Sequence, residues 1–207
     1  MELDHIAIVC ADLAVGTAAV ETALGLPLGP EGRHAHFGTH NRLLSLGPGQ
    51  YLEVIAPDPA APSPRWPRWF GLDDAPAEPR LGNWIVRVDD LDAALTDAPL
   101  EAGRPVDLAR GGLTWRIAVP PDGSLPMAGG WPTLIEWTSG PHPSDTLEDV
   151  GVRLLALEIG HPDAPWLSDR LAGRVKGIDL RFRPAPAPSL AARLRTPEGD
   201  VRLVNFA

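Results

Sequence analysis

Short apolar runs with the alternation of β-strands recur along the chain, and the helical patterns between them are brief. Residues 3–10 form one such run, which ends in Asp12-Leu13, and residues 14–24 then have helix-forming composition up to Gly25. Strand patterning follows up to residue 55. This order predicts a strand, a helix and then three strands, with Asp12 as the N-cap of the helix.

The same order recurs twice. Residues 81–91 again form a strand that ends in Asp-Leu, a helical stretch covers residues 92–98, and strand patterns follow up to residue 138. A weaker copy starts at Leu154, and its helical stretch ends at Gly173. A repeat of this kind determines the architecture, because each copy is one structural unit.

We therefore predict an α+β fold of repeated βαβββ modules that pair into a cupped sheet, with a third, degenerate module at the C-terminus. One helix covers only one face of each module's sheet, so two paired modules enclose a concave seam that suits a ligand. Residues 57–79 and 140–149 are predicted linkers. The chain is expected to form one compact unit whose modules span residues 1–59, 81–140 and 150–207.

Two polar side chains are predicted to face this seam. His5 shares a strand face with Ala7, and Glu53 interrupts an otherwise apolar strand. A buried carboxylate needs a cation or a hydrogen-bond donor, so we expect His5 and Glu53 to face each other across the cup. In the second copy, Asn83 takes the place of His5 and Glu136 takes the place of Glu53.

Four segments make the chain similar to a known family. The opening Leu3-Asp4-His5-Ile6 and residues 38–44, 51–57 and 132–137 resemble the glyoxalase-like domain family of the vicinal oxygen chelate superfamily. The resemblance covers most of residues 1–140. It implies paired βαβββ modules and, in active members, a divalent metal held by first-strand and fourth-strand residues of two modules.

Carried over to this chain, the implied metal ligands are His5, Glu53, Asn83 and Glu136, and the implied ion is Zn, Ni, Mn, Co or Fe. Asn83 stands where the superfamily more commonly has histidine. This departure disfavours a non-haem iron dioxygenase, which needs two histidines and one carboxylate. Glyoxalase I enzymes accept an amide among their ligands, although asparagine is shorter than glutamine.

Two functions follow from the resemblance. The first is a metal-dependent lyase or isomerase acting on a small oxygenated molecule, with Glu136 or Glu53 as the catalytic proton-transfer group. The alternative, which Asn83 favours, is a metal-free protein that binds or sequesters a small molecule, as bleomycin-resistance-like relatives do. In both, the expected substrate contacts are Asn41, Trp115 and Trp69, and the remaining histidines are expected in surface or hydrogen-bonded roles.

Composition excludes other classes of function. The formal net charge is −9 and no window concentrates Lys or Arg, so nucleic acid is not an expected partner. No leader pattern or long apolar stretch appears, so no membrane association is expected. The single cysteine, Cys10, favours a cytoplasmic location and is interpreted as a small buried apolar residue. Modules of this kind pair within or between chains, so a homodimer is one expected assembly.

Overall fold

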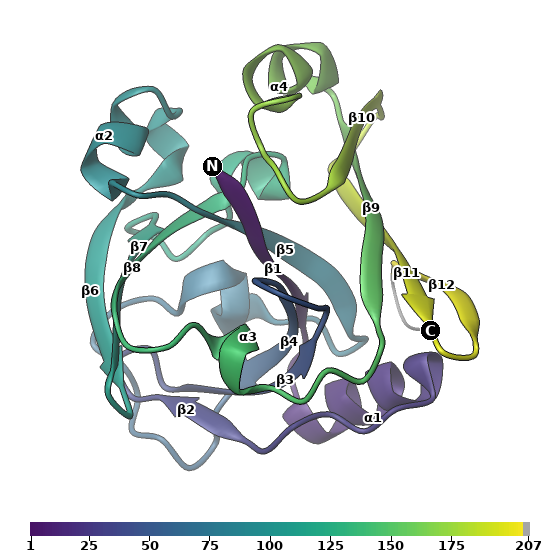
Figure 1. Cartoon of the computed structure of the whole chain (residues 1–207). Coiled ribbons are helices and arrows are strands. Elements are labelled where there is room, and N and C mark those ends of the chain that lie inside the picture. Colours follow the sequence, from purple (N-terminus) through teal and green to yellow (C-terminus); the bar gives the residue numbers. More distant parts are fainter. Residues whose placement is uncertain (205–207) are drawn as a thin grey trace.

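The computed structural model describes residues 1–204, which form two sheets (Figure 1). The predicted order of elements is confirmed in the first module, which consists of β1 (Glu2–Val9), α1 (Leu13–Leu24), β2 (Gly32–His34), β3 (Thr39–Ser45) and β4 (Tyr51–Pro57). The second module repeats it with β5 (Arg80–Arg87), α2 (Leu91–Thr96), β6 (Arg104–Arg110), β7 (Leu113–Val119) and β8 (Thr133–Ser139).

The ends of α1 follow from local chemistry. The side chain of Asp12 accepts hydrogen bonds from the backbone N–H groups of Ala14 and Val15, at 2.7 and 3.1 Å, and so caps the first turn. Gly25 ends the helix in a left-handed conformation, with φ of 69°. Cys10 lies buried beneath the helix, and burial raises the pKa of its thiol to about 12, as suits a small apolar residue.

The two modules pair within one chain into a single eight-stranded sheet, whose order is β2-β3-β4-β1-β5-β8-β7-β6. In each module the first strand runs parallel to the fourth, β1 beside β4 and β5 beside β8. The antiparallel pair of β1 and β5 joins the modules at the centre. The sheet curls around a concave interior, which confirms the predicted cup (Figure 1).

The C-terminal segment contains β9 (Arg153–His161), α4 (Ala164–Leu171), β10 (Asp179–Pro184), β11 (Ser189–Thr196) and β12 (Gly199–Leu203). Its element order repeats that of the modules, but its sheet order is β10-β9-β11-β12. Its first strand therefore lies between the second and third strands rather than beside the fourth. This four-stranded sheet therefore has a different topology from the modules.

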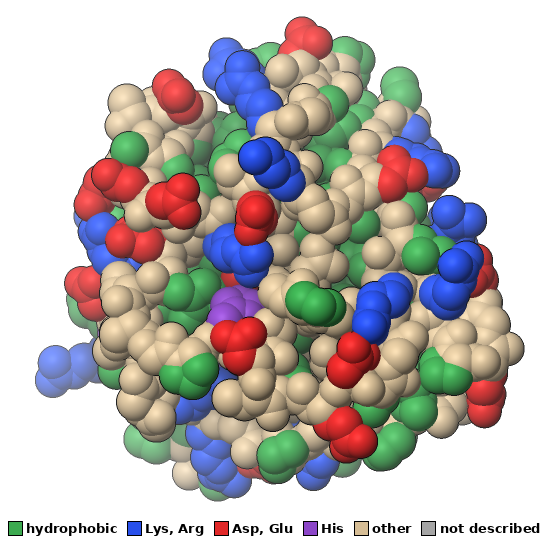
Figure 2. Space-filling model, in the orientation of Figure 1, with side chains coloured by type: hydrophobic (Ala, Val, Ile, Leu, Met, Phe, Trp, Pro, Cys, Tyr) green, Lys and Arg blue, Asp and Glu red, His purple; other side chains and the backbone are tan. Residues whose placement is uncertain are grey.

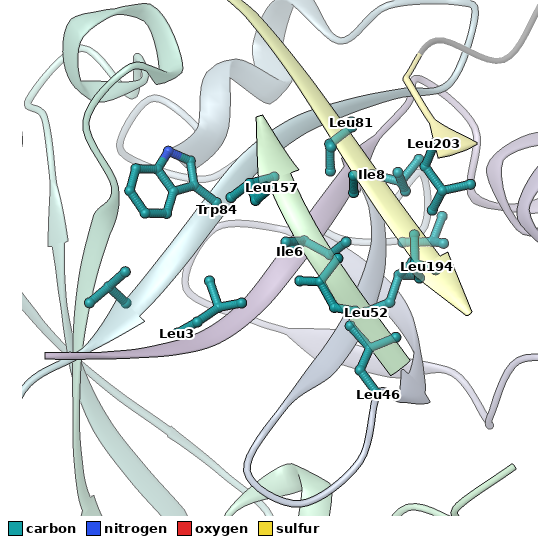
Figure 3. Close-up of a cluster of buried hydrophobic side chains, with 14 of the residues drawn as sticks. Leu3, Ile6, Ile8, Leu46, Leu52, Leu81, Trp84, Leu157, Leu194 and Leu203 are labelled. Atoms are coloured by element: carbon teal, nitrogen blue, oxygen red, sulfur yellow. The ribbon is translucent and has the colours of Figure 1, made fainter. Parts of the chain in front are cut away.

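The small sheet covers the outer face of the large one. Figure 3 shows Leu157 and Leu194 from the small sheet beside Ile6 and Leu52 of the first module. Together with α1 they form one apolar cluster, so this part of the outer face, over the first module, is removed from water. No helix among residues 1–204 has the length and hydropathy needed to cross a membrane.

A second apolar cluster fills the inside of the cup. Much of it comes from the segment predicted as a linker, where the short 3-10 turn η1 (Trp69–Asp74) buries Trp69, Phe70 and Leu72. Trp69 stacks between Phe37 and Phe70, with ring centroids 4.6 and 4.9 Å apart. The other short elements are η2 (Leu100–Ala102), η3 (Pro126–Gly129) and α3 (Pro143–Thr146).

Candidate functional site

His5 and Glu53 lie next to each other on the concave face of the sheet. They come from the neighbouring parallel strands β1 and β4, in which Glu53 pairs with Ala7. Nε2 of His5 is 3.6 Å from Oε2 of Glu53, and both side chains are buried. The ring of His5 also stacks on Tyr51, with centroids 4.3 Å apart.

Asp4 fixes the orientation of His5, although adjacent strand residues normally point to opposite faces. The pairing of β1 with β5 shifts register between Leu3 and His5, and this irregularity at Asp4 turns both side chains inward. Oδ1 of Asp4 is 2.6 Å from Nδ1 of His5. Oδ2 of Asp4 lies 2.9 Å from Nε2 of His142 and accepts a hydrogen bond of 2.9 Å from Nε1 of Trp137.

The carboxylates determine the charge of His5. Burial by itself would lower the pKa of His5, but the adjacent Asp4 and Glu53 outweigh it and raise the pKa to about 9. Burial opposes ionisation of Asp4 and Glu53 too. In both, the neighbouring histidines outweigh burial and hold the pKa below its ordinary value. At neutral pH the site therefore contains an imidazolium between two carboxylates.

A chain of hydrogen bonds continues from Glu53 to the second module. Nδ2 of Asn41 donates to Oε1 of Glu53 at 2.6 Å, and Oδ1 of Asn41 accepts from Nη1 of Arg110 at 3.3 Å. The same Nη1 is 3.1 Å from Nε2 of His34, whose Nδ1 lies 3.2 Å from Oγ1 of Thr39. Burial lowers the pKa of His34 to about 4, so its neutral Nε2 accepts the hydrogen bond from Arg110.

These polar groups line a cavity of about 30 Å³, which has room for roughly one water molecule. The rest of its wall is mainly aromatic and comes from Tyr51, Trp69, Phe70, Trp115 and Trp137. The three residues predicted to contact substrate, Asn41, Trp115 and Trp69, are all part of this wall. Sequence reasoning missed the roles of Asp4 and Arg110 in building the site.

Two predicted ligands lie elsewhere. Glu136 lies on the outer face of β8, where its carboxylate accepts a hydrogen bond from Leu91 N–H at 3.0 Å and pairs with Arg116 at 3.3 Å. The inward residues of that strand are Ile135 and Trp137, so the prediction that Glu136 faces the cup is wrong. Asn83 is buried, and its Nδ2 donates to Oγ1 of Thr133 at 3.0 Å, outside the cavity wall.

The predicted metal-ligand set is therefore not assembled, and the remaining side chains do not fit a divalent ion. A catalytic zinc ion takes three protein ligands, and the facial site of non-haem iron likewise needs three. Residues 1–204 contain no group of three or more His, Cys, Asp or Glu side chains placed to hold one. The cation of Arg110 also lies against Asn41 and His34, where it would repel a metal ion.

A larger open hollow of about 620 Å³ lies outside the cup, beside the start of α1. Both Glu31 and Asp58 on its wall already have partners: Glu31 contacts His40 at 3.3 Å and Arg33 at 2.9 Å, and Arg33 reaches Asp58 at 2.8 Å. Figure 2 likewise shows acidic and basic side chains interspersed over one face of the molecule. The inner cavity is therefore the stronger candidate site.

Comparison with known proteins identifies the family of this chain. The family model described as "Glyoxalase-like domain" matches residues 3–175. Among solved structures, methylmalonyl-CoA epimerase from Mycobacterium tuberculosis is 22% identical, with a TM-score of 0.44, over 68% of this chain and 89% of that one. The Streptomyces coelicolor epimerase in complex with 2-nitronate-propionyl-CoA is 19% identical, with a TM-score of 0.43, over 69% of this chain and 96% of that one. No curated protein matches this chain.

Proposed function

The chain belongs to the glyoxalase-like domain family, and we propose that it is an isomerase-type enzyme. In this proposal it moves a proton on a small oxygenated molecule without a metal ion. One scaffold of this kind hosts several chemistries, so the reaction has to be argued from the site. The observation that carries the proposal is the approach of His5 Nε2 to Glu53 Oε2 at 3.6 Å on the cavity wall.

His5 and Glu53 are a proton donor and a proton acceptor that reach the same small volume. Asp4 occupies Nδ1 of His5, which leaves Nε2–H directed at the cavity. Asn41 occupies Oε1 of Glu53, which leaves Oε2 as the carboxylate oxygen nearest to His5. A substrate placed between them would contact an acid and a base whose positions their neighbours already fix.

The proposed step is the enolisation of a carbonyl compound. Oε2 of Glu53 takes a proton from the carbon next to the carbonyl, and the C–H electron pair becomes the C=C bond of an enol. Nε2–H of His5 gives its proton to the carbonyl oxygen, so no unbalanced charge develops there. The step leaves Glu53 protonated and His5 neutral. Return of the protons to another face or a neighbouring carbon gives the isomer and restores both side chains.

A binding protein without catalysis is the second candidate, because Trp69 and Phe70 fill most of the cup and leave only about 30 Å³. In that function the pair of His5 and Glu53 would serve structure alone. Neither of these two functions uses a metal ion, so removing metal does not distinguish between them. The exchange of a substrate proton with solvent does.

The test is deuterium exchange at carbon, followed by proton NMR. Pyruvate, dihydroxyacetone and phenylpyruvate are incubated in D2O with protein treated with a chelator, beside a blank without protein. We expect faster loss of the α-proton signal from at least one compound, loss of this acceleration in Glu53→Gln, and its retention in Glu136→Gln. The second variant removes the carboxylate on the outer face of the sheet and is the matched control.

Two results would contradict the proposal. Acceleration that survives Glu53→Gln would remove Glu53 from the reaction, and acceleration that disappears on chelation would show that an ion is needed. If none of the compounds exchanges faster with the wild-type protein than in the blank, the binding function replaces the proposed isomerase.

A further inference from the structure

Arg110 is the one cavity residue that brings a full positive charge from the second module to this wall. It ends β6, and the following Gly111 and Gly112 turn the chain in left-handed conformations, with φ of 54° and 88°. The side chain crosses from this hairpin to the first module and contacts His34 and Asn41. Both contacts are to neutral acceptors.

Most of the guanidinium remains available. Both hydrogen bonds come from Nη1, at 3.1 and 3.3 Å. Within residues 1–204, Arg110 forms no ion pair with a carboxylate, and its Nε and Nη2 donate to no protein atom. A guanidinium has five N–H donors in a planar fork that matches a carboxylate. A half-buried cation with a free fork on a cavity wall is suited to bind an anion.

The backbone of the first module leaves a space for this guanidinium. A Cβ added to Gly32 would lie 2.6 Å from Nη1 of Arg110 and 2.6 Å from Oδ1 of Asn41. Gly32 has no left-handed φ, so its backbone does not require glycine. The absence of a side chain at Gly32 is therefore explained by the position of Arg110.

We propose that Arg110 binds the carboxylate of the ligand, and that the site takes a small acid with a flat aromatic group. This inference rests on the proposed function in placing the substrate in the same cavity. The aromatic wall of Trp69, Phe70, Trp115 and Trp137 supplies faces on which a ring can stack. The carboxylate on Arg110 would hold the reacting carbon toward His5 and Glu53.

A ring needs more than the cavity of about 30 Å³, and Phe70 is the side chain that can make room. Phe70 has φ of 59° and ψ of 22°, a left-handed conformation that is unfavourable for a bulky residue. Its ring is held by stacking on Trp69 at 4.9 Å. A ligand ring that stacks on Trp69 would replace that contact and release Phe70 from its strained backbone.

The test compares phenylacetate with phenylacetamide, which have nearly the same shape and differ in charge. Binding is measured by tryptophan fluorescence and by calorimetry, because Trp69, Trp115 and Trp137 line the site. We expect Arg110→Met to weaken phenylacetate binding by about tenfold or more, which is the loss of one charge-assisted pair. The affinity for phenylacetamide should change little.

Two further variants make the result specific. Gly32→Ala keeps the positive charge but fills the space under the guanidinium, so it should also weaken phenylacetate binding, and it serves as the test if Arg110→Met does not fold. Arg104→Met is the matched control, because Arg104 lies exposed at the other end of the same strand. Its affinity for phenylacetate should stay within about twofold of the wild-type value.

The inference is overturned if the wild-type protein binds neither compound at millimolar concentration, or binds both equally well. It is also overturned if Arg110→Met binds phenylacetate as tightly as the wild-type protein does. If Arg110→Met does not fold, the same result with Gly32→Ala overturns it. Phenylacetate binding that depends on Arg110, without proton exchange that depends on Glu53, would keep the anion site and reject the isomerase. Proton exchange that depends on Glu53 but is unchanged in Arg110→Met would keep the isomerase and reject the anion site.

Discussion

Replacing Asp4 by Asn tests whether the carboxylate of Asp4 holds the proton on His5. Asparagine keeps the shape of the side chain but removes the charge that faces Nδ1 of His5 at 2.6 Å. The pKa of His5 is about 9 in the folded chain, against an ordinary value of 6.5. A group whose pKa is raised by folding contributes stability that is complete below its unfolded pKa and is lost as the pH rises through its folded pKa.

The size of this contribution follows from the two pKa values. It amounts to about 3 kcal/mol below pH 6, falls to about 2 kcal/mol near pH 7 and is nearly lost at pH 9. Other shifted groups act outside this window. Burial lowers the pKa of His34 to about 4, so it acts below pH 7, and burial raises the pKa of Cys10 from 9.0 to about 12, so its effect begins near pH 9 and is small within the window. The wild-type protein should therefore lose about 2 kcal/mol between pH 7 and 9 through His5.

Urea unfolding at pH 7, 8 and 9 measures this loss. With a denaturant slope of about 2 kcal/mol per molar, the wild-type midpoint should fall by about 1 M across the window. Asp4→Asn should be less stable at pH 7 and nearly independent of pH. Asp149→Asn is the control, because Asp149 forms an exposed pair with Arg153 at 2.7 Å and its loss should leave the slope unchanged. A variant of Asp4 that keeps the wild-type slope would refute the reasoning.

Three other changes test the fold and the corrected position of Glu136. Glu136→Gln should lower the free energy of unfolding by about 1 kcal/mol, because it weakens the hydrogen bond to the first turn of α2 and the pair with Arg116. Elemental analysis should find the metal content of this variant unchanged. A drop in bound metal would contradict the outward position of Glu136. Gly16→Ala should lower the free energy of unfolding by about 1–3 kcal/mol, since its Cβ would collide with Sγ of Cys10; an unchanged melting temperature would disprove the tight packing of α1. Leu157→Ala should cost about 2–5 kcal/mol in urea unfolding, and a smaller loss would mean that the small sheet covers the large one only loosely.

The fold could be predicted because its signals are local and repeated. The N-cap Asp12 and the stop at Gly25 are properties of a few adjacent residues, and their recurrence identifies the modules. The topology of the C-terminal sheet could not be predicted in this way. The apolar pattern of β9 indicates a buried strand, but it does not indicate which strands lie beside it. In the structure β9 pairs with β10 and β11 rather than with β12.

The site could be predicted only where simple strand alternation holds. Glu53 faces the cup as expected from the alternation of its strand, whereas Glu136 takes the place of Glu53 only in the sequence of the second copy. The inward positions of β8 are those of Ile135 and Trp137, so Glu136 is offset by one residue and points outward. Asp4 faces inward only because of an irregular register, and Arg110 arrives from a hairpin distant in sequence. No local sequence pattern predicts the inward direction of Asp4 or the position of Arg110.

The charges of the site favour a proton at His5. The cations of His5 and Arg110 balance the carboxylates of Asp4 and Glu53, so these four side chains carry no net charge at neutral pH. A metal ion binds neutral imidazole, and because the two carboxylates raise the pKa of His5, a proton would have to leave the ring before an ion could bind there. The positive charge of Arg110 would repel a metal ion, and it would attract the carboxylate of a ligand. We therefore expect the cup to select an anion and to use His5 as an acid.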